Sequence, residues 1–249
     1  MRLHQIDALR GFALFGILVV NIFIFHAPYS HYYDVYGSFE GIDGQVVDKM
    51  IFFFGGKFMF IYAFLFGYSF WLQYERSLET DLFQSYWTRR MIVLAGIGML
   101  HIILLSYGDI LLAYALLGLI LPLISNWNNR ALFGLFLLIY LTPVYEFILS
   151  AFVEYEPLFI KPVVPLDEYI EIYGSGSYWE TIQLRVKDYF SFRNEKLVHY
   201  IPKEISLFII GILSARMKLA DQVTSKKLPI FSLVAAVYVF WLRFYQPDV

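Results

Sequence analysis

The chain contains long runs of apolar residues separated by short polar segments. A helix needs about 20 mostly apolar residues to cross the hydrocarbon core of a bilayer, because backbone groups that face lipid must be hydrogen-bonded within the helix. Seven runs fit this pattern, and they cover residues 8–25, 50–72, 91–105, 110–127, 131–152, 202–215 and 228–245. The pattern predicts an all-α polytopic membrane bundle of about seven transmembrane helices, forming a single domain over residues 1–249.

The polar segments between the runs predict how the bundle is oriented. Short loops rich in Lys and Arg face the cytoplasm. Such residues gather in alternate segments: Arg2 and Arg10; Arg76, Arg89 and Arg90; Arg130; and Arg216, Lys218, Lys226 and Lys227. We therefore expect a cytoplasmic N-terminus and an external loop over residues 154–200. Within that loop, apolar residues recur at helical spacing from Tyr178 to Phe192, which is typical of a helix lying on a membrane surface.

Composition excludes a water-soluble protein. Of the 249 residues, 59% are hydrophobic and 16% are charged, against roughly 25% charged in an ordinary globular domain. The mean hydropathy is +0.59. A net charge of −2 argues against nucleic acid as a partner, so the expected partner is the lipid bilayer. The absence of Cys excludes thiolate metal sites and a cysteine nucleophile, and no metal site is expected.

Polar residues inside the first run lie on one stripe. Ionisable groups within spans are costly and by default mark functional sites. Asp7, Arg10, Leu14, Ile17 and Asn21 are separated by three or four residues, which places them along one side of a helix. Asp7 and Arg10 are spaced for an ion pair. The alternative is that Asp7 caps the helix and Arg10 extends its side chain to the interface.

The later runs add three ionisable residues toward the predicted outer side. Lys57 lies in the second run and His101 in the third, and Asp109 begins the fourth after a tight turn at residues 106–109. This turn predicts a helical hairpin in which Asp109 orients His101 as a general base. Each of these residues also has a structural interpretation that stays open. Lys57 can extend to the membrane interface, His101 can be a hydrogen-bonded core residue, and Asp109 can cap the helix that follows it. At the cytoplasmic edge, Arg10, Arg89 and Arg90 could bind an anionic headgroup or a cofactor phosphate. Alternatively, they are there because positively charged residues flank membrane helices on the cytoplasmic side.

Several motifs resemble the YeiB-like family of bacterial membrane proteins. They are the segment 6–22, Lys57-Phe58 with 64–67, Arg89-Arg90 with 98–101, and 108–116. The resemblance covers nearly the whole chain and implies a multi-pass protein of the bacterial plasma membrane. It also implies a chain shorter than full-length family members.

The opening motif is also similar to that of membrane-bound acyltransferases such as heparan glucosaminide acetyltransferase. That resemblance implies acyl transfer from acyl-CoA to an extracytoplasmic acceptor. Asn21 matches the relative's first-span Asn, and His31 lies near the position of its His. In this hypothesis His101 or His31 is the base, Asn21 and Lys57 stabilise the oxyanion, and Arg10, Arg89 or Arg90 bind the phosphates.

Two other hypotheses use the same residues. A cavity lined by Asn21, Lys57, His101 and Asp109 fits a small-solute transporter. Alternatively, the chain is a membrane subunit, either of a homo-oligomer or of an assembly whose other member supplies further spans.

Overall fold

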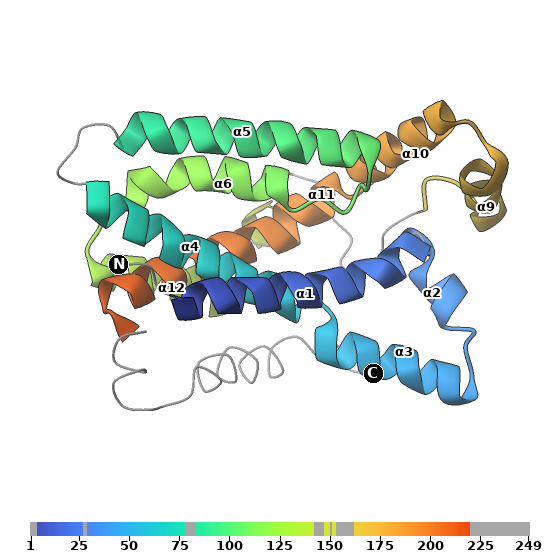
Figure 1. Ribbon diagram of the computed structural model, residues 1–249, viewed down its shortest axis with the longest axis horizontal. Coiled ribbons are helices and arrows are strands. Elements are labelled where there is room, and N and C mark those ends of the chain that lie inside the picture. The colour runs from blue at the N-terminus through green and yellow to red at the C-terminus, as the bar shows by residue number, and fades with distance from the viewer. Residues whose placement is uncertain are drawn as a thin grey trace.

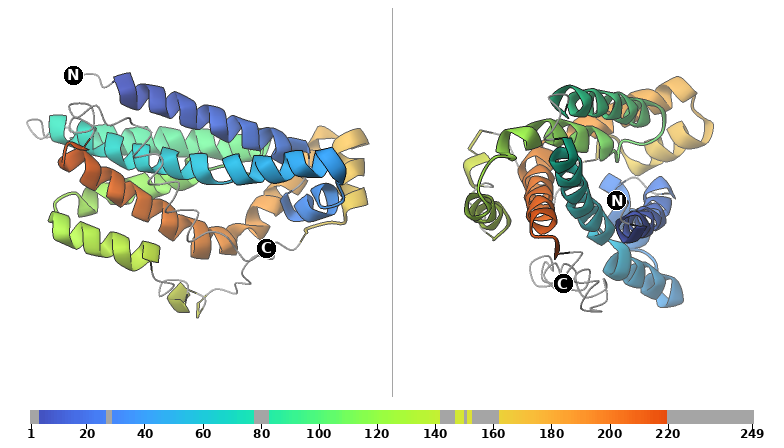
Figure 2. Two further views of the ribbon diagram at one scale, coloured as in Figure 1. Left: turned by 90° about the horizontal axis from the view of Figure 1, so that it is seen from below. Right: turned by 60° about the vertical axis from the view of Figure 1, so that its left-hand side comes forward.

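The computed structural model is built of helices that lie roughly along one common axis (Figures 1 and 2). It describes residues 4–26, 29–77, 83–141, 147–149, 151–152 and 162–219, and every element named in these ranges is helical. The longer helices are α1 (His4–His26), α3 (Gly41–Phe54), α4 (Lys57–Ser77), α5 (Phe83–Leu104), α6 (Leu111–Ile124), α7 (Asn129–Leu141), α9 (Leu166–Ser175), α10 (Tyr178–Ser191) and α12 (Ile201–Arg216). Shorter turns of helix are η1 (Tyr29–His31), α2 (Tyr32–Tyr36), α11 (Arg193–Glu195) and the π-helical turn η2 (Lys196–Tyr200).

Three helical stretches in the described ranges are long and apolar enough to cross a membrane. They cover Gly41–Ser77, Phe83–Leu104 and Lys196–Arg216, which suggests a membrane protein. The apolar helices Leu111–Ile124 and Asn129–Tyr140 are shorter. The predicted count of seven spans and the cytoplasmic N-terminus stay predictions. The expected seventh span, 228–245, lies outside the described residues.

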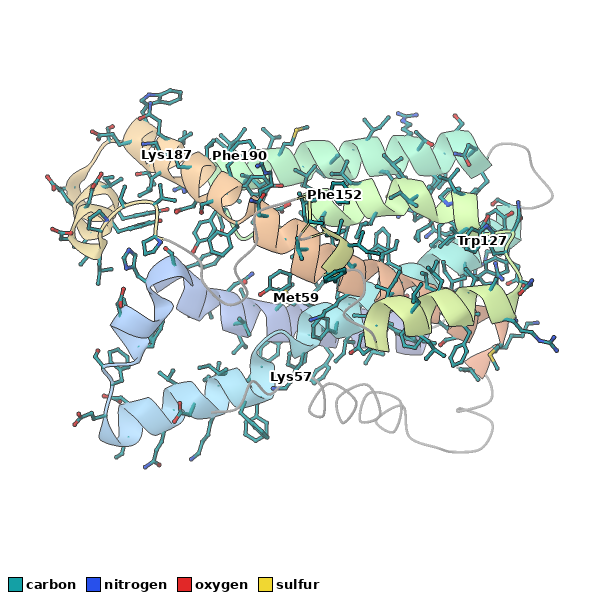
Figure 3. The ribbon with its side chains drawn as sticks, turned by 180° about the vertical axis from the view of Figure 1, so that it is seen from behind. Lys57, Met59, Trp127, Phe152, Lys187 and Phe190 are labelled. Carbon is teal, nitrogen blue, oxygen red and sulfur yellow. The ribbon has the colours of Figure 1, made fainter. Side chains whose placement is uncertain are left out.

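The second predicted span, 50–72, is divided where α3 meets α4. Gly56 adopts a positive φ of 67°, a conformation that glycine enters without a steric penalty. The amide of Gly55 donates to Ile51 O and closes the end of α3. Lys57 therefore begins α4, and Figure 3 shows it at this junction.

α4 lies at the centre of the bundle and packs against both α12 and α1. On one side its Phe66 stacks on Phe208 of α12, with ring centroids 4.7 Å apart. The same ring contacts Trp87 of α5 and Tyr114 of α6 edge-on. These aromatic contacts join four helices in one core. On the other side, α4 shares a second apolar cluster with α1 that includes Ala13.

α5 and α6 form the predicted helical hairpin. Gly98 makes their close approach possible, because a Cβ at this position would come within 2.5 Å of Leu112 N on α6. Trp87 fixes the other end of the pair by donating from Nε1 to Gly118 O at 2.8 Å. The outer face of α5 is apolar and exposed, for example at Ile92, which suits contact with lipid.

The segment expected to form an external loop, residues 154–200, contains α9 and α10 among its described helices. α10 confirms that residues 178–192 form a helix, whereas its expected place on a membrane surface stays a prediction. It begins with a capping box, in which Ser177 and Glu180 bond reciprocally to backbone amides. α10 also covers the C-terminal end of α5. Arg185 donates to Leu104 O at 2.7 Å and Tyr178 donates to the same carbonyl at 3.0 Å, which satisfies groups that the helix end leaves open.

Candidate functional site

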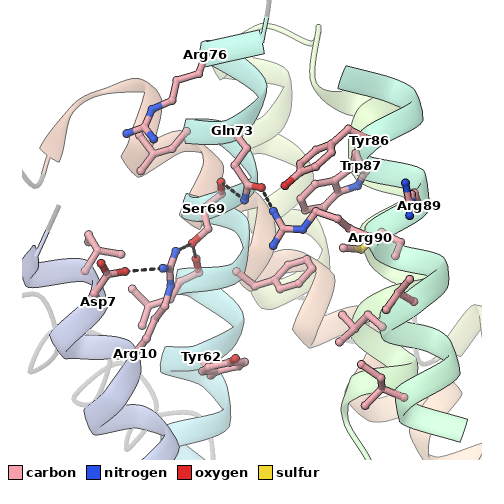
Figure 4. Close-up of a pocket in the computed structure, with 18 residues that line it drawn as sticks. Asp7, Arg10, Tyr62, Ser69, Gln73, Arg76, Tyr86, Trp87, Arg89 and Arg90 are labelled. Atoms are coloured by element: carbon pink, nitrogen blue, oxygen red, sulfur yellow. Dashed lines mark hydrogen bonds and ion pairs between the residues drawn. The ribbon is translucent and has the colours of Figure 1, made fainter. Parts of the chain in front are cut away.

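Two groups of polar residues in the described ranges lie at opposite ends of the central helices α4 and α5. The first is a cavity of about 780 Å³ between α1, α4 and α5 (Figure 4). Four arginines line it: Arg10, Arg76, Arg89 and Arg90. We call it the arginine cavity. It brings together the three arginines that the sequence analysis assigned to phosphate binding, and it adds Arg76.

A chain of side-chain contacts crosses the arginine cavity and holds its cations in place. Arg10 donates to Asp7 Oδ1 at 2.8 Å, which confirms the predicted ion pair. The same guanidinium donates to Ser69 on α4. Gln73, one turn further along α4, accepts from Arg90 of α5. Arg90 also lies over the ring of Tyr86, with 5.6 Å between guanidinium carbon and centroid. Bonds of this kind pre-orient cations for an anionic ligand.

The rest of the arginine cavity is mainly apolar. Its lining includes Leu65 and Phe66 from α4 and Leu94 and Ile97 from α5. Arginines with apolar walls suit a ligand that carries both negative charge and a hydrocarbon part. The phosphates and the acyl-pantetheine arm of acyl-CoA have this chemistry, so the residues present fit that co-substrate.

The second region surrounds the hairpin between α5 and α6, and we call it the His101 site. The Nδ1 of His101 lies 3.1 Å from Asp109 Oδ2, and the Asp109 side chain is only 1% exposed. The angle between the two groups is poor for a hydrogen bond, so neither atom has a well-directed partner in the described ranges. The other oxygen, Asp109 Oδ1, accepts from Leu112 N at 2.8 Å. Asp109 therefore accepts from an amide in the first turn of α6 and also contacts His101, and its role in orienting His101 stays a prediction.

Two ionisable residues of the His101 site were missed by the sequence analysis. Lys196 of η2 donates to Tyr107 O at 3.4 Å and interacts electrostatically with Asp109 and Glu204. Glu204 of α12 is 5% exposed, and its Oε2 has no hydrogen-bond partner among the described residues. Lys196 lies within the long segment 154–200, where its spacing gives no signal of a site. Glu204 follows Pro202 at the start of an apolar run, and that position was the available signal.

The contacts that the structure records for Lys57 lie at the end of α3, and no described contact joins Asn21 to the His101 site. Lys57 Nζ donates to Ile51 O at 3.4 Å and lies over the Phe52 ring, so it serves the end of α3. Its 4% exposure also differs from the open interface position that was considered. Asn21 is half-buried near the end of α1, and the described ranges record no hydrogen bond to its side chain.

His31 belongs to a separate cluster with α9 and α10. Its Nδ1 lies 2.7 Å from Asp34 Oδ2, and its Nε2 lies 2.9 Å from Val164 O. Both ring nitrogens of His31 are therefore within hydrogen-bond distance of a partner. With both nitrogens engaged, His31 is a poor general base, and of the two predicted bases the geometry favours His101.

Asp188 of α10 lies beside this cluster. Tyr169 of α9 donates to its Oδ1, whereas Oδ2 is buried and has no partner in the part of the chain that the structure describes. Burial raises the pKa of Asp188 to about 6, against the opposing effects of Tyr169 and the charge of His31. Neither region has a set of three or more His, Asp or Glu side chains, among the described residues, that could hold a metal ion.

Comparison with known proteins finds two relatives, both uncharacterised. YxaH of Bacillus subtilis is 28% identical over 240 residues, covering 87% of this chain and 58% of YxaH. YeiB of Escherichia coli is 33% identical over 118 residues, covering 46% of this chain and 29% of YeiB. These relatives support a YeiB-like family. No protein-family model and no solved structure matches the chain.

The chain thus spans little more than half the length of YxaH and under a third of YeiB. Neither relative's name states an activity. Together with the apolar helices, they are consistent with a membrane protein whose function has to be inferred from its own sites.

Proposed function

We propose that this chain carries the acyl-transfer site of a multi-pass plasma-membrane protein that moves an acyl group from acyl-CoA to an extracytoplasmic hydroxyl or amine. The observation that carries the proposal is the arrangement along α5. Leu94 and Ile97 line the arginine cavity, and His101 follows Ile97 by one turn on the same side of the helix. Arg90 and His101 are separated by about 16 Å along the axis, at about 1.5 Å per residue.

The arginine cavity supplies donor binding in this proposal. Arg10 and Arg90 are already oriented by Asp7 and Gln73, so little side-chain entropy is lost when phosphates bind. The apolar wall formed by Leu94 and Ile97 then directs the acyl-pantetheine arm along α5 toward His101. The arginine cavity therefore serves as the cytoplasmic entrance.

The His101 site supplies acid–base chemistry. Asp109 faces Nδ1, which directs Nε2 toward the acceptor. As the acceptor oxygen or nitrogen attacks the thioester carbonyl, its proton passes to Nε2 and the new C–O or C–N bond forms. Collapse of the tetrahedral intermediate breaks the C–S bond, and His101 returns the proton to the departing thiolate. The products are the acylated acceptor and CoA-SH.

The test uses purified protein in sealed vesicles that enclose a mixture of amine and hydroxyl acceptors. Radiolabelled acetyl-CoA is added, and the transfer of its acetyl group to the acceptors is measured. Arg90→Ala should raise KM for acetyl-CoA on the order of 10-fold by removing one phosphate partner. His101→Ala should lower kcat on the order of 100-fold or more.

The matched control is Arg130→Ala, which removes an exposed arginine of α7 that is absent from the arginine cavity. It should leave both constants unchanged. Absence of transfer by folded wild-type protein, together with no binding of CoA, contradicts the proposal.

A further inference from the structure

The arginine cavity is open on the side of α5 that suits contact with lipid. Val93 and Ile97 line the cavity, and their side chains are 55% and 50% exposed. Ile92 beside them is 62% exposed and lies outside the lining. Because α5 is among the helices that are long and apolar enough to cross a membrane, this exposed face would lie against hydrocarbon. A ligand can therefore enter the arginine cavity sideways from the bilayer.

Charged and apolar residues follow one another along this wall of the cavity. Arg90 is followed by Val93, Leu94 and Ile97 at spacings of three, four and seven residues, which places all of them on one side of α5. At about 1.5 Å per residue, Ile97 lies about 10 Å further along the helix axis than Arg90. A phospholipid in the leaflet that contains the arginines has the same order, with its phosphate at the interface and its chains directed toward the bilayer centre.

Two arginines from opposite walls of the cavity are held in position for a phosphate. Figure 4 shows Arg10 on α1 and Arg90 on α5, on either side of α4. Each is hydrogen-bonded to a side chain of α4, Arg10 to Ser69 and Arg90 to Gln73. Guanidinium groups stay charged in proteins, and they bind phosphates through paired hydrogen bonds. Basic pockets between membrane helices bind the headgroups of anionic lipids in this way.

We propose that the arginine cavity binds an anionic phospholipid, with the headgroup phosphate between Arg10 and Arg90 and an acyl chain along Val93, Leu94 and Ile97. This lipid site goes beyond the proposed function and does not depend on it. Phosphate joined to hydrocarbon is also the chemistry of acyl-CoA, so the two ligands compete for one cavity. If the proposed function holds, the amount of anionic lipid in the membrane sets how much of the protein is free to bind its acyl donor.

The first experiment measures lipid selectivity. Native mass spectrometry of the purified protein in detergent, titrated with phosphatidylglycerol or phosphatidylcholine of the same chains, gives the Kd for each lipid. Phosphatidylglycerol should bind on the order of 10-fold more tightly, and Arg90→Gln should remove this preference. Arg130→Gln, at an exposed position of α7 outside the cavity, should keep it. Equal Kd values for the two lipids, or an equal preference in wild type and Arg90→Gln, overturns the proposal.

The second experiment distinguishes a lipid from a free phosphate. Inorganic phosphate and glycerophosphoglycerol, which is the headgroup without its chains, should displace phosphatidylglycerol only at concentrations on the order of 100-fold above its Kd, because they lack the apolar contacts. Displacement by either compound at the Kd of the lipid overturns the lipid as the occupant.

A matched pair of variants tests the sideways opening. Val93→Trp adds bulk at the opening and should weaken phosphatidylglycerol binding on the order of 10-fold. Ile92→Trp adds bulk at the neighbouring exposed position outside the cavity and should leave the Kd unchanged. Both positions are exposed, so neither substitution disturbs the core. Equal binding by the two variants overturns the proposed entry from the bilayer.

CoA added to the complex with phosphatidylglycerol separates this proposal from the proposed function. Displacement of the lipid by CoA supports both. Lipid binding that depends on Arg90 and that CoA does not displace would retain the lipid site and reject the donor site. Binding of CoA to protein that shows no preference for phosphatidylglycerol would do the reverse.

Discussion

At the scale of single residues, the burial of Asp188 makes the stability of the fold depend on pH. Its side chain is 1% exposed, and burial raises its pKa to about 6 from an ordinary 3.8. The folded state therefore binds this proton more tightly than the unfolded state. The contribution of protonated Asp188 to the free energy of unfolding is therefore complete below pH 3.8, and it is lost as the pH rises through about 6. The raised pKa corresponds to a loss of about 3 kcal/mol.

Asp188→Asn should therefore stabilise α10 at pH 8 by up to about 3 kcal/mol and have little effect at pH 4. The Asn oxygen keeps the hydrogen bond from Tyr169, and the buried charge is gone. Hydrogen-exchange protection factors of the α10 amides, corrected for intrinsic rates, measure the difference. Glu171→Gln on the exposed face of α9 is the control. If the α10 amides of Asp188→Asn and of wild type had equal protection factors at pH 8, the buried charge of Asp188 would not destabilise the fold.

Residue spacing predicted those parts of the candidate site that lie on single helices or one hairpin. The pairs Asp7–Arg10 and His101–Asp109 were both expected, and both are close in the structure. Lys196 and Glu204 could not be found in this way. Their neighbours Tyr107, Asp109 and Tyr114 come from the turn between α5 and α6 and from α6 itself, far earlier in the chain. One-dimensional periodicity carries no information about which helices pack together.

At the scale of helices, α4 and α12 approach so closely that glycine is needed at the contact. A Cβ on Gly67 would lie 2.0 Å from Phe208 O, and a Cβ on Gly211 would lie 2.2 Å from Phe64 O. Both obstacles are backbone atoms, which cannot rotate away. Small residues serve the same purpose in membrane helices generally, since close packing replaces the hydrophobic driving force there.

Gly211→Ala should force α4 and α12 apart and destabilise the protein by about 1–3 kcal/mol. Thermal unfolding in detergent, followed by loss of the monodisperse species, measures the change. Gly96→Ala provides a helical control, because an added Cβ on this residue of α5 meets nothing within 4 Å. That variant should be neutral or slightly stabilising. Similar melting temperatures for both variants would refute a tight α4–α12 contact.

Helix positions were also predictable where a helix ends on a local signal. A helix at residues 178–192 and a hairpin turn at residues 106–109 were both expected, and both are present. The division of the 50–72 run was not expected, because glycine is common inside membrane helices and Gly55 and Gly56 therefore gave no signal of a break. The deciding feature is the positive φ of Gly56, a backbone conformation that hydropathy does not report.

At the scale of the whole molecule, the two polar regions lie at opposite ends of α4 and α5, so the proposed reaction depends on orientation. The start of α5 and the end of α4 contribute the arginine cavity, whereas α9 and α10 lie beyond the opposite end (Figures 1 and 4). A CoA donor comes from the cytoplasm, so the arginine cavity has to face inward. The distribution of Lys and Arg predicts this orientation, with α9 and α10 outside.

Cysteine labelling tests this orientation with no background, because the chain has no Cys. Gly174→Cys, on exposed α9, should react in intact cells with a membrane-impermeant thiol reagent. Ser77→Cys, at the end of α4, should react only after the membrane is permeabilised, since it lies on the side of the arginine cavity. The reverse pattern would place the arginine cavity outside, away from cytoplasmic acyl-CoA. It would then exclude the proposed direction of transfer, however well the two sites bind their ligands.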